Sequence, residues 1–206
     1  PTDLMPLLSA SVKSAYEARK AKSGGGGGSY LNPSSISDGE KVRISFLGED
    51  SFAGFEAWVS SRDGSKRIPL RFGQEPTRSD LEERAADEGG VVDAETVAKP
   101  FFAFAVWNYE TASVQVFQFS QQSLAGPIID ALSDEEVEAE ASAYDFVISA
   151  TGTGRDKRYG ALAVPGRRRK ADVAKKVDEA WEAVVEKGFD LSVLLSGGDP
   201  FKGLNF

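Results

Sequence analysis

Apolar and polar residues alternate at every second position over residues 41–49, which is the period of a half-buried strand. A further apolar segment at residues 52–61 predicts a second strand. The Asp-Gly pair at residues 63–64 is typical of a tight hairpin turn. We therefore expect residues 66–72 to fold back as the hairpin partner.

The most apolar part of the chain predicts two further strands at residues 99–109 and 113–119, rich in aromatic and β-branched side chains. Residues 144–151 and 159–164 predict another pair of strands. The loop between them, residues 152–158, contains GTGRD. This stretch has neither the third glycine of a dinucleotide fingerprint nor a following GK[ST], so we interpret it as a flexible hairpin tip.

Two helices are predicted in the second half of the chain. Residues 120–132 resemble a short helix capped by Ser120 and broken or kinked at Pro127. Residues 172–187 repeat apolar side chains at helical spacing. The last residues, from position 196, are predicted to form a tail.

The order of these elements predicts the fold class. Five or six strands, a helix between the fourth and fifth, and an acidic insertion at residues 73–98 favour a mainly β, OB-fold-like Greek-key barrel with peripheral α-helices. An immunoglobulin-like sandwich is the competing all-β interpretation. We divide the chain into an N-terminal helix with a Gly-rich linker (1–29), the OB-like core (30–170), and a C-terminal helix and tail (171–206).

Charge is segregated along the chain, although the formal net charge is −8. Residues 73–98 and 130–145 are strongly acidic, whereas residues 146–170 are basic. Because the basic residues are concentrated in one segment, the negative net charge does not exclude a nucleic-acid partner. The acidic segments would compete with bound polyanion for the basic surfaces and discourage unselective binding.

The absence of cysteine and histidine from the 206 residues narrows the chemistry. It excludes disulfides, thiol nucleophiles and Ser/His catalysis, and a zinc site would have to use carboxylates alone. We interpret the many carboxylates as solvated surface residues. The alternative is a nuclease whose metal ion is held by carboxylates.

Basic residues are interleaved with aromatic residues at predicted strand ends and hairpin tips. Single-stranded nucleic acid is bound by this combination, because unpaired bases stack on aromatic rings while cations contact the phosphates. Core packing is the alternative for the aromatic residues, above all for the phenylalanines at residues 101–119. The candidate residues for binding single-stranded nucleic acid are Phe55, Trp58, Arg62, Lys66, Arg67, Arg71, Trp107, Tyr109, Arg155, Lys157, Arg158 and Tyr159.

Three stretches together resemble the phage-encoded single-stranded DNA-binding proteins with an OB core. They are GGGGGSYLNPSSISDGEKVRISFLGE (24–49), FFAFAVWNYETASVQVFQFSQQSLAGPIIDAL (101–132) and YDFVISATGTGRDKRYGALAVP (144–165), about half of the chain, in the order typical of that family. The last motif is the most specific. The chain departs from it at Ala150, where the family often has a basic residue, and at Lys157.

The resemblance implies binding of single-stranded DNA in phage DNA replication or recombination, without catalysis or an obligatory cofactor. It places Arg155, Lys157, Arg158 and Tyr159 on one wall of the site. From OB topology we infer that Trp58 and the hairpin ending at Arg71 form the opposite wall. The runner-up is an OB-type protein-interaction module of a replication assembly that does not touch DNA.

Both ends of the chain suggest protein partners. An amphipathic helix is expected at residues 3–22, tethered by the glycines at 24–28. The tether raises the helix's local concentration, so we expect self-association and cooperative coating of the strand. Residues 199–201 resemble the acid-Pro-Phe tip by which bacterial single-stranded DNA-binding proteins recruit replication partners; a frayed tail is the alternative.

No apolar run reaches the length of a membrane span, and the first residues lack the pattern of a signal peptide. We therefore expect no membrane partner and a cytoplasmic location, which for a phage-encoded protein is the host cytoplasm.

Overall fold

The computed structural model describes residues 29–133, 144–167 and 170–201. The predicted N-terminal helix, the glycine run and most of the acidic segment 130–145 lie outside these residues. One sheet contains β1 (Tyr30–Leu31), β2 (Lys41–Ser61), β3 (Arg67–Phe72), β4 (Gly90–Val91), β5 (Lys99–Asn108), β6 (Ser113–Phe119), β7 (Tyr144–Thr151) and β8 (Arg158–Pro165). The helical elements are η1 (Pro33–Ser35), α2 (Arg78–Asp87), α3 (Gln122–Leu132), η3 (Gly154–Asp156), α5 (Ala171–Glu186) and η5 (Leu191–Ser196).

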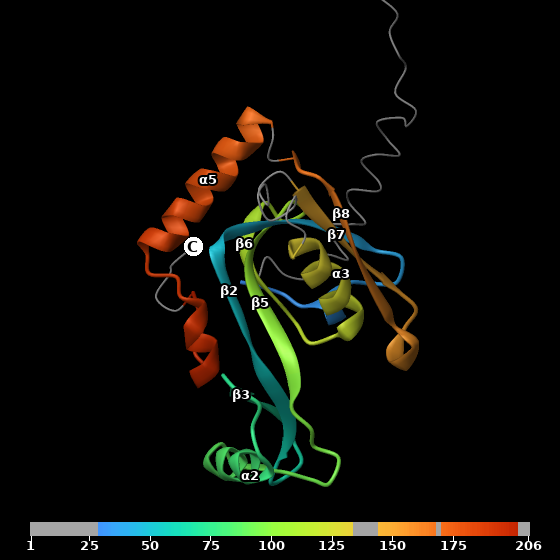
Figure 1. Ribbon diagram of the computed structural model, residues 1–206, viewed down its shortest axis with the longest axis vertical. Coiled ribbons are helices and arrows are strands. Elements are labelled where there is room, and N and C mark those ends of the chain that lie inside the picture. The colour runs from blue at the N-terminus through green and yellow to red at the C-terminus, as the bar shows by residue number, and fades with distance from the viewer. Residues whose placement is uncertain (1–28, 134–143, 168–169, 202–206) are drawn as a thin grey trace, which may run out of the picture.

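The strand order β1-β6-β5-β2-β7-β8 confirms the mainly β, OB-like fold class. Strands β2, β5 and β6 form an antiparallel meander, α3 follows, and β7 returns to pair with β2 before turning into β8. The curled sheet has the shape of a half-barrel with α3 near β8 (Figure 1). Because the described strands form a single sheet, the alternative of two packed sheets is wrong.

Strand β2 extends well beyond the barrel. The sequence predicted two strands here, whereas the structure has one strand of 21 residues with a register shift between Phe46 and Ser51. Gly48 lies in this irregular part with φ +68°, and a Cβ on it would approach the Trp181 ring to 2.9 Å. The distal part of β2, from Ser51 onward, pairs with β3 and β5 to form an arm that ends near α2 (Figure 1).

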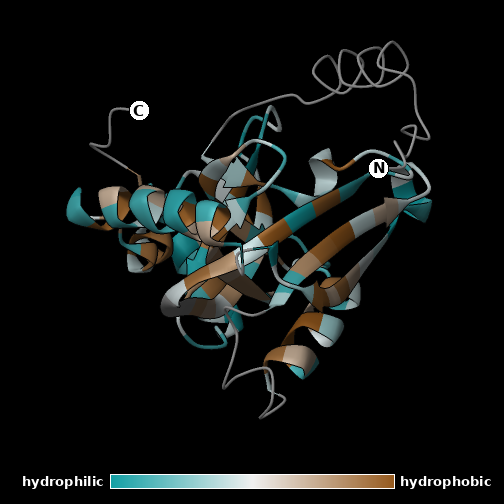
Figure 2. Cartoon of the chain, turned by 90° about the horizontal axis from the view of Figure 1, so that it is seen from above, coloured by the Kyte–Doolittle hydropathy of each residue, from teal (hydrophilic) through white to brown (hydrophobic). Residues whose placement is uncertain are grey.

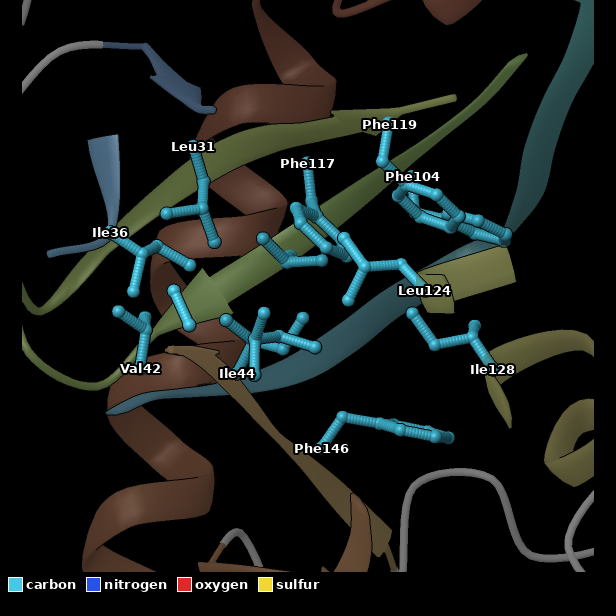
Figure 3. Packing of buried hydrophobic residues seen from close by; sticks show 13 residues of the cluster. Leu31, Ile36, Val42, Ile44, Phe104, Phe117, Phe119, Leu124, Ile128 and Phe146 are labelled. Atoms are coloured by element: carbon cyan, nitrogen blue, oxygen red, sulfur yellow. The ribbon is translucent and has the colours of Figure 1, made fainter. Parts of the chain in front are cut away.

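Hydrophobic residues pack on both faces of the sheet. Figure 3 shows the first cluster, in which Ile44 and Phe117 from the sheet meet Leu124 of α3. The second cluster lies between the opposite face and the apolar stripe of α5, and includes Phe101 and Val177. Hydrophobic and hydrophilic residues alternate around the turns of α5 (Figure 2), as the helical spacing predicts.

A smaller third hydrophobic cluster lies in the arm. Val59 of β2 and Leu70 of β3 pack with Ala85 of α2, and all three are buried. Helix α2 of the acidic insertion has ten residues and begins at a capping box between Thr77 and Asp80. The insertion therefore covers one face of the arm.

Two local predictions require correction. Helix α3 continues through Pro127 and begins after Gln121, not at a Ser120 cap. Residues 199–201 are not a frayed tail, because Pro200 and Phe201 are buried. The Phe201 ring packs edge-on against Phe189 and Tyr30, so a recruiting tip with an exposed phenylalanine is absent from this conformation.

Candidate nucleic-acid interface

Trp58 is the most exposed of the three tryptophans and lies on the face of the arm opposite α2. Along β2, Ala57 and Val59 are buried on the side of α2, so strand alternation directs Trp58 to the opposite face. Its side chain is 45% exposed, whereas Trp107 is 7% exposed. A half-exposed indole on a sheet face can stack on a base.

A buried carboxylate fixes the polar edge of this indole. Glu56 Oε1 accepts a hydrogen bond from Trp58 Nε1 at 2.8 Å. Its Oε2 accepts from Arg71 Nε at 3.1 Å and from Gln118 Nε2 at 3.3 Å. One carboxylate thus joins side chains from β2, β3 and β6, with Glu56 itself only 6% exposed.

Cations surround Trp58 on the same face. The Arg67 Nη2 atom donates to the Trp58 carbonyl oxygen at 3.0 Å, and the Arg71 guanidinium lies 5.3 Å from the Phe101 ring centre. Arg62 and Lys66 flank the hairpin turn at the end of the arm and are exposed. Four of the predicted basic residues therefore lie on β3 or in the turn that joins β2 to β3.

Acidic residues lie beside the same tryptophan. A hollow on one side of Trp58 is also lined by Arg67, Lys99, Asp93 and Glu95. The last two belong to the acidic insertion, which brings its carboxylates next to the cations. Such a surface favours a polyanion only when the cations outcompete these carboxylates.

The second predicted group occupies the β7–β8 hairpin tip. Arg155 and Arg158 are exposed, and the Lys157 Nζ atom lies 5.4 Å from the Tyr159 ring centre. Gly152, with φ +78°, allows the turn, and its N–H donates to Asp38 at 2.7 Å. Tyr159 is partly buried against the barrel core.

The residues of β1 and η1 bridge the two groups. Asn32 lines a hollow shared with Trp58, and its side chain accepts a hydrogen bond from the Ser34 N–H at 2.9 Å. The Ser34 carbonyl oxygen in turn accepts from Lys157 Nζ at 2.7 Å. Asn32 and Ser34 thus connect the surface at the arm with Lys157 at the hairpin tip.

Three predicted aromatic residues do not belong to this surface. Phe55 follows the alternation of Ala57 and so lies on the α2 side. Trp107 is part of the second hydrophobic cluster. Tyr109 donates to Asp145 Oδ1 at 3.1 Å, and burial together with that carboxylate raises the pKa of Tyr109 to about 12.

Sequence reasoning missed Tyr30, Gln118 and Lys99. Tyr30 is 40% exposed because β1 is a short parallel strand at the edge of the sheet, paired with β6. Burial, the Asp199 charge and the hydrogen bond to Asp199 raise the pKa of Tyr30 to about 12. The alternation of β6 was a usable signal for Gln118, which follows the inward-facing Val114 and Val116.

The described residues contain no cluster of three or more potential metal-ligating side chains. Among the same residues, no helix combines the length and apolar character needed to cross a membrane. A scan against protein-family models and a search of curated proteins found no match to this chain. The candidate interface therefore rests on the geometry of these residues alone.

Proposed function

We propose that this chain is a sequence-nonspecific single-stranded DNA-binding protein that coats exposed strands by base stacking and phosphate contact. The observation that carries the proposal is the half-exposed Trp58 ring, fixed by Glu56 on the face of the arm opposite α2, with Arg67 and Arg71 nearby. An exposed ring with a fixed orientation loses little conformational entropy when a base stacks on it.

The path of the strand follows the surface already described. It runs from the arm across β1 and η1 to Arg155 and Arg158 at the β7–β8 tip. Phosphates would contact the exposed cations at both ends, and bases would stack between them. In a phage, such a protein would act in DNA replication or recombination, with residues 1–29 mediating cooperative coating.

Tryptophan fluorescence tests the proposal. Oligo-dT should quench the wild-type protein, and Trp58→Phe should abolish most of the quenching, because Trp107 is buried and Trp181 is packed over Gly48. Loss of the stacked ring in Trp58→Ala should weaken binding by about 1–3 kcal/mol. Absence of both quenching and binding to a labelled oligonucleotide at low salt would refute the function.

A second function is favoured by the carboxylates around Trp58. Asp93 and Glu95 line the same hollow as Arg67. A mixed acidic and basic surface around an exposed tryptophan is also typical of a protein interface, where tryptophan and arginine are frequent hot spots. An OB-type interaction module without DNA contact would show unchanged tryptophan emission with oligo-dT at every salt concentration.

A further inference from the structure

A second hollow, of about 410 Å³, lies on the side of Trp58 toward β1. Tyr30, Trp58, Arg71 and Gln118 line it, together with the turn at Gly197. Its volume is near the lower end of the range for small-molecule sites, so it suits a single flat group. Neither Tyr30 nor Gln118 was among the residues predicted from the sequence.

Both aromatic rings of this hollow are half-exposed and held at their polar ends. The Tyr30 hydroxyl donates to Asp199 Oδ1 at 3.2 Å, and its ring packs edge-on against Phe201 at 6.5 Å. The Trp58 indole is held by Glu56 at 2.8 Å. Two exposed rings in fixed orientations are prepared for stacking, because ordering them adds little cost to binding.

Polar groups of the hollow retain hydrogen-bonding capacity. Within the described part of the chain, Arg71 donates from Nε to Glu56 and from Nη1 to the Leu194 carbonyl oxygen, which leaves Nη2 for a ligand. Gln118 uses Nε2 toward Glu56, so its Oε1 atom remains an acceptor. A donor and an acceptor side by side match the edge of any nucleobase.

We propose that this hollow is a subsite for one unpaired nucleobase, which stacks on Trp58 and contacts Tyr30, while Arg71 and Gln118 hydrogen-bond to its edge. The inference rests on the proposed single-stranded DNA binding and deepens it. Because Arg71 Nη2 offers a donor and Gln118 Oε1 an acceptor, and every base carries both kinds of group on its edge, the subsite accepts different bases and does not read sequence.

Photocrosslinking of the wild-type protein to an oligonucleotide of 5-iodouracil residues tests this placement directly. Tyr30 or Trp58 should be the principal crosslinked residues when the products are mapped by mass spectrometry. Crosslinks confined to the β7–β8 tip would overturn the subsite. This measurement needs no variant, so it stands even where a substitution disturbs folding.

Affinity measurements give the second arm of the test. Tyr30→Ala should weaken oligo-dT binding about 5- to 150-fold, the range for one lost stacking contact. Tyr30→Phe keeps the ring and should stay within about twofold. Val185→Ala, which shortens an exposed side chain on α5, is the matched control and should bind as the wild type does.

The two hypotheses fail differently. Suppose that the wild type binds oligo-dT with quenching of Trp58, while Tyr30→Ala binds with the same affinity and gives the same crosslinks as the wild type. The subsite is then refuted and the proposed function stands. If an aromatic dipeptide, and not an oligonucleotide, quenches Trp58, the hollow serves a protein partner. No oligonucleotide binding at all refutes the function itself.

Discussion

The two halves of strand β2 each contribute to a buried pair of arginine and carboxylate, in different surroundings. In the barrel half, Arg43 Nε donates to Asp145 Oδ2 at 2.7 Å, and the Arg167 N–H donates to the same atom at 2.9 Å. In the arm half, Glu56 pairs with Arg71 at 3.1 Å. Asp145 is fully buried, whereas the Glu56 network borders a hollow and fixes an exposed tryptophan.

The pair at Asp145 therefore has a structural role, whereas the pair at Glu56 also positions an exposed side chain. Around Asp145, the guanidinium groups of Arg43 and Arg167 lie 6.0 and 5.8 Å from the Tyr109 ring centre, and Arg43 also donates to the Pro165 carbonyl oxygen. These hydrogen-bond donors join β2 and β7 to the end of β8 and the segment after it. Around Glu56, the donors come from side chains that also face the proposed ligand.

The largest effect is expected in the barrel half. Asp145→Ala should lower the free energy of unfolding by about 3–5 kcal/mol, because it leaves the Arg43 charge without its buried partner. Urea denaturation measures the loss. The control Glu179→Ala removes an exposed partner of Lys175 and should change little. A loss of under about 1 kcal/mol for Asp145→Ala would mean that the Arg43–Asp145 pair does not have the structural role inferred for it.

In the arm half, the same kind of change should affect binding as well as stability. Glu56→Gln removes the charge that faces Arg71, and should cost about 1–3 kcal/mol of unfolding free energy. It should also weaken oligo-dT binding by the folded protein and shift the Trp58 emission. Asp145→Asn is the matched variant, for which we expect binding to stay normal while stability falls. Equal binding by both variants would contradict a positioning role for Glu56.

Salt dependence compares the cations of the two regions. The exposed pair Arg62 and Lys66 ends the arm, and the exposed pair Arg155 and Arg158 flanks the β7–β8 tip. Replacing either pair with glutamine should flatten the slope of log affinity against log salt by up to about 1.4, since each lost phosphate contact contributes about 0.7. Fluorescence titrations at several salt concentrations measure the slope. If only the tip pair matters, the strand does not reach the end of the arm.

The smallest effect is expected at the turn that ends the arm. Hydrogen bonds from the Ser61 hydroxyl and from the Ser65 N–H and hydroxyl lower the pKa of Asp63 to about 2, from an ordinary 3.8. A lowered folded-state pKa stabilises the turn above the unfolded value, and this contribution is lost as pH falls from about 4 to about 2.

Amide exchange at Ser65 should follow that pH window. The exchange rate should depart from its intrinsic pH dependence between about pH 4 and 2, and Asp63→Asn should abolish the departure. The barrel amides should not respond in this window if the turn opens alone. A titration of Asp63 near its ordinary value would mean that these hydrogen bonds do not form in solution.

Elements with a clear hydrophobic period or a specific turn motif could be predicted from the amino-acid sequence alone. Alternation in residues 41–49, the Asp-Gly hairpin turn and the apolar stripe of α5 are local properties, so the strands and the helix could be predicted where the structure has them. The charge of the β7–β8 tip was also readable, because a hairpin tip is exposed in almost any fold.

Which aromatic rings are accessible to solvent depends on how the strands and helices pack together. Trp58 and Trp107 both occur in apolar strands, yet one is half-exposed and the other is buried under α5. Tyr30 and Trp58 meet at one hollow because β1 pairs with β6 and the arm brings β2 past it. Contacts between residues so distant in the chain depend on sheet order and register, which no local pattern encodes.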